Sequence, residues 1–277
     1  MSESPSSMVD RVVVILGVFE RSAGPLNLGQ ISACSGLPRS SVHRILQQLV
    51  NARLLSRYDN EYRLGLRMFE IGSLVTHRTR MGEVARPLLQ ELHAATGHVV
   101  HMAVLDQQDI VYLERVGGSF ASTLPSRIGG RLPAHCTALG KALLAYSAKE
   151  VVDEYLWSGL CRRTAVSINT PQALETALSR IRSIGYATET GEAAASVACV
   201  AAPVLVLDQP VAAISVCGPQ DRIRVDELRF QVQWIAAEAA RRLMVSSRRQ
   251  RPRPRRLITA VPLSGHAASA ELSETGR

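Results

Sequence analysis

Two short helices separated by a sharp turn are the strongest constraint that this sequence places on its own fold. They occupy residues 28–50, with Gly36 between them and Pro38 at the start of the second helix, where a missing backbone N–H is tolerated. In the second helix the apolar residues recur at the spacing of one buried face: Val42, Ile45, Leu46 and Leu49. The stretch therefore predicts a helix pair that packs on a hydrophobic core.

The opposite face of the second helix is polar but carries neither Glu nor Lys. It presents hydroxyl, imidazole, guanidinium and amide groups, which come from Ser40, His43, Arg44, Gln47 and Gln48. Such groups read base edges or hold phosphates. An ordinary amphipathic helix pair with a polar exterior is the more common origin of this spacing, so the helix alone leaves both interpretations open.

A predicted β-hairpin follows directly and favours nucleic-acid binding. Residues 54–58 and 61–64 are strand-like and are joined by a tight turn at Asp59-Asn60. With a first helix at 8–21, these elements predict a winged helix-turn-helix over residues 8–65, whose second helix would enter the major groove. The residues that we expect near DNA are Arg39, Ser40, Ser41, His43, Arg44 and Gln47 in the helix, and Arg57 and Arg63 in the wing.

The net charge of +8 is concentrated at the two ends of this 277-residue chain. The first 80 residues hold ten Arg and six acids, giving +4, whereas residues 81–246 carry −1 and residues 247–277 carry +5. This division is typical of a nucleic-acid-binding head on a nearly neutral body. The Arg- and Pro-rich segment 247–277 is expected to be a disordered tail that can add non-specific phosphate contacts.

Five scattered cysteines indicate reduced thiols in a cytoplasmic protein. They show no Cys-x-x-Cys pair and no zinc-like spacing with His: Cys34, Cys136, Cys161, Cys199 and Cys217. No signal peptide is visible, and no apolar run approaches the roughly 20 residues of a membrane span. We expect no metal, no cofactor and no membrane partner.

The rest of the chain predicts a linker and a second domain. Residues 66–80 favour a linker helix whose apolar residues are expected to pack, against a second subunit for example. Beyond it, hairpins at 99–105 with 110–116 and at 198–207 with 211–217 alternate with helices at 84–97, 137–148, 171–184 and 225–245. This order predicts an α+β fold with a sensor domain over residues 81–246, rather than a parallel doubly wound sheet.

Three passages, in this order along the chain, resemble the IclR family of bacterial transcription regulators over residues 8–246. The first is residues 31–49, the second is 132–145, and the third combines 185–187, 199–204 and 212–219. The resemblance implies a winged-helix head, a linker helix and a GAF-like effector-binding domain. It also implies a homodimer or homotetramer, a palindromic double-stranded DNA operator, and small-molecule effectors that are often carboxylates or aromatic compounds.

The helix predicted to start at Thr137 is a candidate effector site. The backbone N–H groups of Ala138, Leu139 and Gly140 would lack intrahelical partners there, which favours an anion. Alternatively, Thr137 only caps the helix and the small residues allow close packing. The residues alone favour this second interpretation, whereas the resemblance favours the first, because the family's effector pocket uses this turn.

The resemblance adds further effector-binding candidates, namely Glu189, Cys199, Ser215 and Cys217. Cys217 stands where family members often have Ser, and Ser196 where Gly is frequent. Arg131 is a candidate to meet a carboxylate bidentately, although an isolated Arg at such a place is more often a surface residue.

Catalysis is an alternative that the residues disfavour. His135 and Cys136 are neighbours, and neighbours on an extended segment point to opposite faces, so His135 is badly placed to activate the thiol. Cys199 lies in an apolar run and is expected to be a buried small hydrophobe. We therefore do not expect an enzyme. We expect a ligand-responsive regulator that senses a small organic acid, a class that includes aromatic acids. A DNA-binding dimer with an empty, structural C-terminal body is the second hypothesis.

Overall fold

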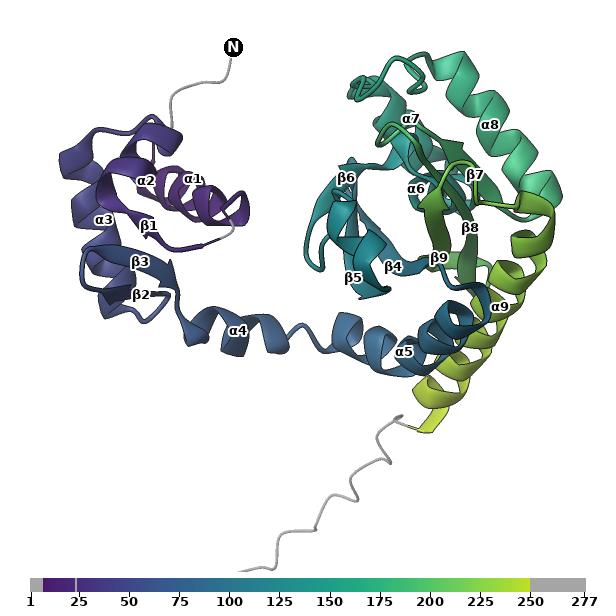
Figure 1. Ribbon diagram of the computed structural model, residues 1–277, viewed down its shortest axis with the longest axis horizontal. Helices are drawn as coiled ribbons and strands as arrows, with labels where there is room; N and C mark the ends of the chain where they lie inside the picture. Colours follow the sequence, from purple (N-terminus) through teal and green to yellow (C-terminus); the bar gives the residue numbers. More distant parts are fainter. Residues whose placement is uncertain (1–6, 23, 250–277) are drawn as a thin grey trace, which may run out of the picture.

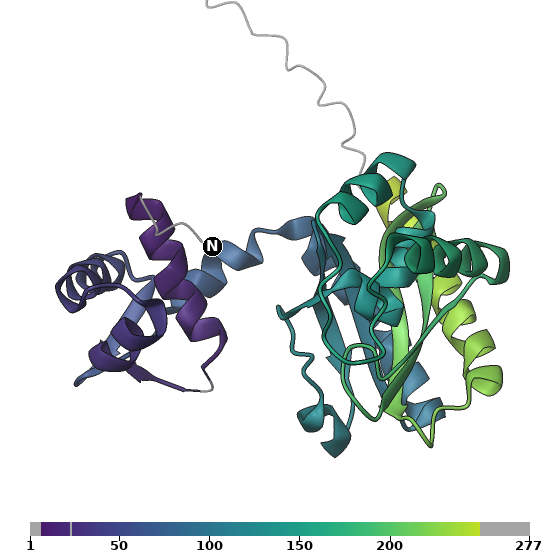
Figure 2. The same ribbon diagram turned by 90° about the horizontal axis from the view of Figure 1, so that it is seen from above.

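The computed structural model describes residues 7–22 and 24–249 as a small head and a larger body joined through helix α4, Leu66–Ser73 (Figures 1 and 2). Head and body have separate hydrophobic cores. The predicted combination of a winged helix-turn-helix and an α+β domain is confirmed. The expected tail falls mostly on residues 250–277, which lie outside the described residues.

The head contains three helices and a small antiparallel sheet. The helices are α1 (Met8–Glu20), α2 (Leu28–Ser35) and α3 (Arg39–Asn51), and the strands are β1 (Leu26–Asn27), β2 (Leu55–Tyr58) and β3 (Glu61–Leu64). An Asn27–Gln30 capping box begins α2, and Gly36 ends it in the left-handed conformation that glycine adopts easily. Val42, Ile45, Leu46 and Leu49 are all buried, as their spacing predicted.

The linker differs from its prediction. Instead of one helix over 66–80, α4 ends at Ser73 and a second helix, α5 (Thr76–Thr96), runs from there into the body. Val75 lies between them with non-helical ψ of 63°. Leu66 and Phe69 of α4, and Leu74 just after its end, are more than 70% exposed, which is unusual for a solvated helix.

The body is built on a six-stranded antiparallel sheet of order β6-β5-β4-β9-β8-β7. Its strands are β4 (Val99–Asp106), β5 (Asp109–Val116), β6 (Arg131–Pro133), β7 (Ala187–Thr190), β8 (Val197–Val206) and β9 (Gln209–Pro219). Both predicted hairpins are confirmed. Strands β6 and β7 were missed because three or four residues show no recognisable alternation.

Helices cover both faces of this sheet (Figure 1). Helix α5 and the C-terminal helix α9 (Val225–Arg249) pack on one face, and α6 (Ala138–Tyr146) with α8 (Pro171–Ile184) packs on the other. Helix α9 runs four residues beyond its predicted end. The predicted helix 137–148 ends at Tyr146, and the unpredicted α7 (Lys149–Trp157) follows it.

The turn before α6 is packed closely against the helix itself. After β6 the chain makes a 3-10 turn at Ala134–Cys136, and a Cβ atom at Gly140 would overlap the carbonyl group of Ala134. Gly140 therefore allows the start of α6 to lie directly on the preceding turn, as the close-packing alternative proposed.

Gly140→Ala should destabilise the body, because the added methyl group can be accommodated only by moving backbone. We expect the free energy of unfolding to fall by about 1–3 kcal/mol, the usual range for overpacking, in urea denaturation monitored by circular dichroism. Gly118→Ala is the matched control, since nothing lies within 4 Å of a Cβ atom there. Equal stability of the two variants would contradict the close packing.

Candidate nucleic-acid interface and ligand cavity

Helix α3 presents a polar face on the outside of the head. Arg39, Ser40, Arg44 and Gln47 are exposed, and Ser41 and His43 are half-buried. The helix contains no Asp, Glu or Lys, so its outer surface offers hydrogen-bond donors and positive charge without competing carboxylates. This is the surface that a major groove requires of an inserted helix.

The hairpin β2–β3 forms the wing beside α3. The Arg57 guanidinium is held back over the turn: its Nε atom donates to the carbonyl oxygen of Asp59 at 2.8 Å, and its charge lies 5.7 Å from the centre of the Tyr62 ring. Arg63 is exposed on β3, opposite Ser56. Among the described residues, the structure shows such contacts with the turn for Arg57 but not for Arg63.

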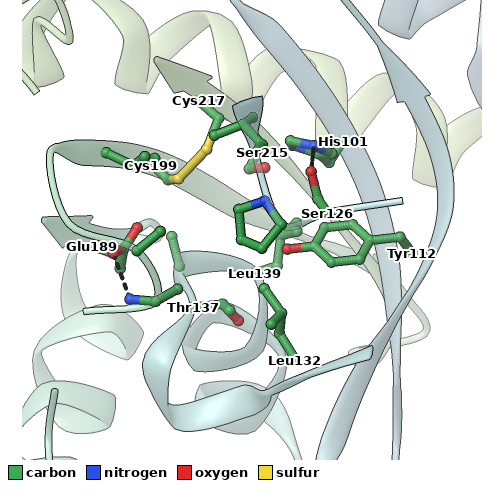
Figure 3. Close-up of a pocket in the computed structure, with 16 residues that line it drawn as sticks. His101, Tyr112, Ser126, Leu132, Thr137, Leu139, Glu189, Cys199, Ser215 and Cys217 are labelled. Atoms are coloured by element: carbon green, nitrogen blue, oxygen red, sulfur yellow. Dashed lines mark hydrogen bonds between the residues drawn. A yellow bond between two sulfur atoms is a disulfide. The ribbon is translucent and has the colours of Figure 1, made fainter. Parts of the chain in front are cut away.

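A small cavity of about 30 Å³ lies between the sheet and the start of α6 (Figure 3). Its wall combines residues from all six strands of the sheet, the start of α6, the loop before β6 and the turn between β7 and β8. The lining residues are His101, Tyr112, Leu124, Pro125, Ser126, Leu132, Thr137, Ala138, Leu139, Glu189, Ala193, Ala194, Val197, Cys199, Ser215 and Cys217. None of them is Arg or Lys.

His101 and Tyr112 are buried, uncharged polar groups on neighbouring strands. The Nε2 atom of His101 lies 2.8 Å from Oγ of Ser126, and the His101 ring is 5.1 Å from that of Tyr112. Burial, with the charge of Arg115, lowers the pKa of His101 to about 3, so the imidazole is neutral. Burial also raises the pKa of the Tyr112 phenol, which stays a hydrogen-bond donor.

Glu189 is the acidic group of this wall, and its pKa lies nearest to neutral pH. Its Oε1 atom accepts the backbone N–H of Ala193 at 3.0 Å, and its side chain is almost completely buried. Burial raises the pKa of this carboxyl to about 7. The neighbouring buried ion pair joins Lys141 Nζ to Glu192 Oε1 at 2.5 Å, so that lysine is already neutralised by its own partner.

The start of α6 serves both as a cap and as a source of free donors. Thr137 Oγ1 accepts the N–H of Gly140 at 2.9 Å, while the N–H groups of Ala138 and Leu139 have no acceptor within the helix. Ala138 and Leu139 line the cavity, and Gly140 does not. The two alternatives for this turn are therefore compatible.

Of the other predicted effector residues, four line the cavity and one lies outside it. Glu189, Cys199, Ser215 and Cys217 lie in the cavity wall with Thr137. Arg131 lies outside it on β6, where its guanidinium pairs with the carboxylates of Asp106 and Asp109.

Sequence reasoning missed His101, Tyr112 and the loop containing Leu124, Pro125 and Ser126. The one available signal was His101, a single polar residue within the apolar run of β4. The loop residues carried no signal, because their place beside β4 is set by the tertiary fold.

The expectation of five reduced thiols is wrong, because Cys199 and Cys217 form a disulfide. Their side chains face the cavity (Figure 3), so Cys199 is not an inert small hydrophobe. Cys34, Cys136 and Cys161 are free.

His135 and Cys136 do not form a catalytic pair, although the reason differs from the predicted one. The segment is a 3-10 turn and not extended. The ring of His135 is occupied elsewhere: Nδ1 lies 2.7 Å from the hydroxyl of Tyr155, and Nε2 lies 2.9 Å from the carbonyl oxygen of Cys161. Burial raises the pKa of the Cys136 thiol, which disfavours the nucleophilic thiolate.

Within residues 7–22 and 24–249, no group of three or more His, Cys, Asp or Glu is placed to hold a metal ion. In the same part of the chain, no helix is both long and apolar enough to cross a membrane.

A winged-helix head on an α+β domain whose mainly apolar cavity carries a few polar groups defines the class of ligand-responsive transcription regulators. Comparison with known families agrees: residues 8–59 match the IclR helix-turn-helix domain, and residues 73–244 match the bacterial transcriptional regulator IclR C-terminal domain. The chain belongs to the IclR family, and it is a DNA-binding transcription regulator with a C-terminal effector-binding domain.

Individual relatives cover nearly the whole of the matched region. The regulator XynR of Escherichia coli K12 is 33% identical over 85% of this chain and 96% of its own length, and the repressor IclR of the same organism is 30% identical over 79% and 82%. Among solved structures, an IclR homologue of Microbacterium hydrocarbonoxydans complexed with 4-hydroxybenzoate is similar, with a TM-score of 0.78 and 28% identity over 86% of this chain and 100% of that one.

Stability should depend on pH through Glu189. Because its pKa is raised to about 7 from the ordinary 4.5, the folded chain holds a proton that the unfolded chain has already released, and the free energy of unfolding should fall as the pH rises from about 4.5 to about 7. Glu189→Gln removes this pH-dependent contribution to the free energy of unfolding. The stability of the variant relative to wild type should therefore increase between pH 5 and pH 8, by at most about 3 kcal/mol in urea denaturation. Glu175→Gln, at an exposed position of α8, is the control. Parallel pH profiles for wild type and Glu189→Gln would contradict the assignment.

Proposed function

We propose that this regulator binds a palindromic operator as a homodimer or homotetramer and senses a small organic acid, aromatic ones included, in the cavity beside α6. The observation that carries this proposal is the composition of the cavity wall, in which uncharged hydrogen-bond donors converge between apolar surfaces. The protein would act in the cytoplasm, where its DNA target lies.

The chemistry of the cavity wall suits a flat carboxylate. Leu124, Leu132 and Val197 provide apolar surface, while the N–H groups at the start of α6 supply donors for an anion. With no Arg or Lys in the wall, the carboxylate would be held by hydrogen bonds and by the positive end of the helix dipole. The 4-hydroxybenzoate with which the similar Microbacterium homologue is complexed belongs to this chemical class.

DNA recognition is assigned to α3 and the wing. Arg39, Ser40, Arg44 and Gln47 are exposed on one helix face and would reach base edges or phosphates, with Ser41 and His43 beside them and Arg57 and Arg63 on the wing. A palindromic operator requires two heads. The exposed apolar residues of α4 and its C-terminal end support a second copy that covers them, since a monomer would leave Leu66, Phe69 and Leu74 in water.

Effector binding would act on DNA affinity by favouring one arrangement of the paired heads. A ligand changes such an equilibrium only by its difference in affinity for the two arrangements. A body without a ligand, the second hypothesis, would leave buried polar groups such as Glu189 facing an empty cavity.

Arg44→Ala should weaken operator binding, because it removes a charged donor from the centre of the exposed α3 face. We expect a loss of about 1–3 kcal/mol in binding free energy, measured by fluorescence anisotropy at physiological salt on DNA from upstream of the protein's own gene. Arg180→Ala, which removes the same charge from an exposed position of α8, should bind as wild type does. Unchanged affinity of Arg44→Ala would remove this residue from the interface, and a footprint without two-fold symmetry would contradict the dimeric mode.

Aromatic acids should raise the melting temperature of the full chain in a thermal-shift screen with 4-hydroxybenzoate as the first probe, since a ligand of the folded state stabilises it. Tyr112→Phe keeps the ring but removes a buried donor, so it should weaken binding by about 1 kcal/mol. Tyr146→Phe, on α6 but outside the cavity lining, is the matched control. If no small organic acid shifts the melting temperature of wild type, the structural-body hypothesis is favoured.

A further inference from the structure

The disulfide Cys199–Cys217 joins two strands inside the wall of the ligand cavity. Cys199 on β8 is the register partner of Cys217 on β9, and their Cα atoms are 4.3 Å apart. This spacing is typical of directly opposed residues in an antiparallel pair that do not hydrogen-bond to each other, where side chains come closest. Both cysteines line the cavity (Figure 3).

The disulfide also lies beside the acidic group of the cavity. Glu189 on β7 is the register partner of Cys199, so Glu189, Cys199 and Cys217 form one row across three adjacent strands. Cys199 is half-buried and Cys217 is buried. A change at these sulfur atoms therefore occurs next to the carboxyl of the cavity wall.

The cross-link is not needed to hold the two strands together. Strands β8 and β9 are paired along their whole length, from Val197 opposite Pro219 to Val206 opposite Gln209. The sequence separation of the cysteines is only 18 residues, so the bond closes a short loop of the unfolded chain and stabilises the fold less than a long-range cross-link would. In the reducing compartment where a DNA-binding regulator works, disulfides are usually transient, catalytic or redox-sensing.

We propose that Cys199 and Cys217 are a reversible oxidation site whose state sets the affinity of the cavity for an aromatic carboxylate. The ligand part of this inference rests on the proposed function. The oxidant is of the hydroperoxide class: one thiolate attacks the O–O bond and becomes a sulfenic acid with release of water or an alcohol. The second thiol then displaces water to form the S–S bond. Each cycle consumes one peroxide and two thiol hydrogens, and a dithiol reductant restores both thiols by exchange and becomes a disulfide itself.

The two states differ in the shape of the cavity. Non-bonded heavy atoms need about 3.5–4 Å between centres, whereas a disulfide holds its sulfurs about 2 Å apart. Reduction therefore pushes the sulfur atoms into the space beside Glu189 and adds two S–H groups. The oxidised chain binds the carboxylate more tightly, and by reciprocity the bound ligand makes the disulfide harder to reduce.

The experiment uses the full chain, fully reduced with dithiothreitol or reoxidised with stoichiometric hydrogen peroxide. Thiols counted under denaturing conditions should fall from five to three on oxidation, and peptide mass mapping should place the bond between Cys199 and Cys217. Calorimetric titration with 4-hydroxybenzoate and related benzoates should give a dissociation constant about fivefold or more lower for the oxidised form. Cys199→Ser should lose this redox dependence, and Cys34→Ser, at an exposed free cysteine of the head, should retain it.

Three results are informative in different ways. Five thiols remaining after peroxide, or a bond mapped to other cysteines, would overturn the oxidation site. Equal affinities in both states would overturn the coupling but leave the proposed function intact. If none of the acids binds either form, the aromatic-acid function fails together with the coupling, while the thiol count still decides whether the site is reversibly oxidised.

Discussion

The alternation of side chains across the central sheet of the body is the constraint on which the rest of the domain depends. On β4, Val100, Met102 and Val104 enter the core under α5 and α9, whereas His101 points to the opposite face and the cavity. Strand β9 behaves in the same way, with Val216 in the core and Cys217 in the cavity wall. A register slip of one residue would exchange these sets and place an imidazole in the core. The apolar face therefore fixes which polar groups a ligand meets.

Because the cavity is lined without a cation, its electrostatics depend on Glu189. An anionic ligand cannot lie comfortably beside an ionised carboxylate in a buried site, since like charges repel strongly where water is excluded. A carboxyl whose pKa is about 7 resolves this conflict by taking up a proton when the anion binds, and it then supplies another donor. Binding of a carboxylate should accordingly be accompanied by proton uptake at neutral pH. The buried Lys141 does not change this balance, because Glu192 already neutralises it.

Local patterns predicted the elements, while long-range pairing decided the site. The buried face of α3 followed from the spacing of Val42, Ile45 and Leu46, and Gly185 ended α8 as expected, because both effects act within one or two helical turns. The site residues named from the family resemblance largely reached the cavity wall. The proximity of Cys199 to Cys217 depends on strand register, which no short segment of sequence reveals. Arg131 lies instead beside Asp106 and Asp109 at the hairpin end, where its ion pairs are also long-range.

Because of the same alternation, one strand contacts both the cavity and the helix that follows the linker. Strand β4 presents His101 to the cavity, while its other face contacts α5, the helix that continues from the linker. A ligand that shifts β4 or its neighbour β9 must therefore disturb the packing of Leu88 and Leu92, because a close-packed core transmits small displacements. Helix α5 begins just after the break at Val75, where the backbone leaves the helical conformation. Helices α4 and α5 are therefore separate elements, and under the proposed function this interruption, which the sequence did not predict, is the place where a change in the body would become a change in head position.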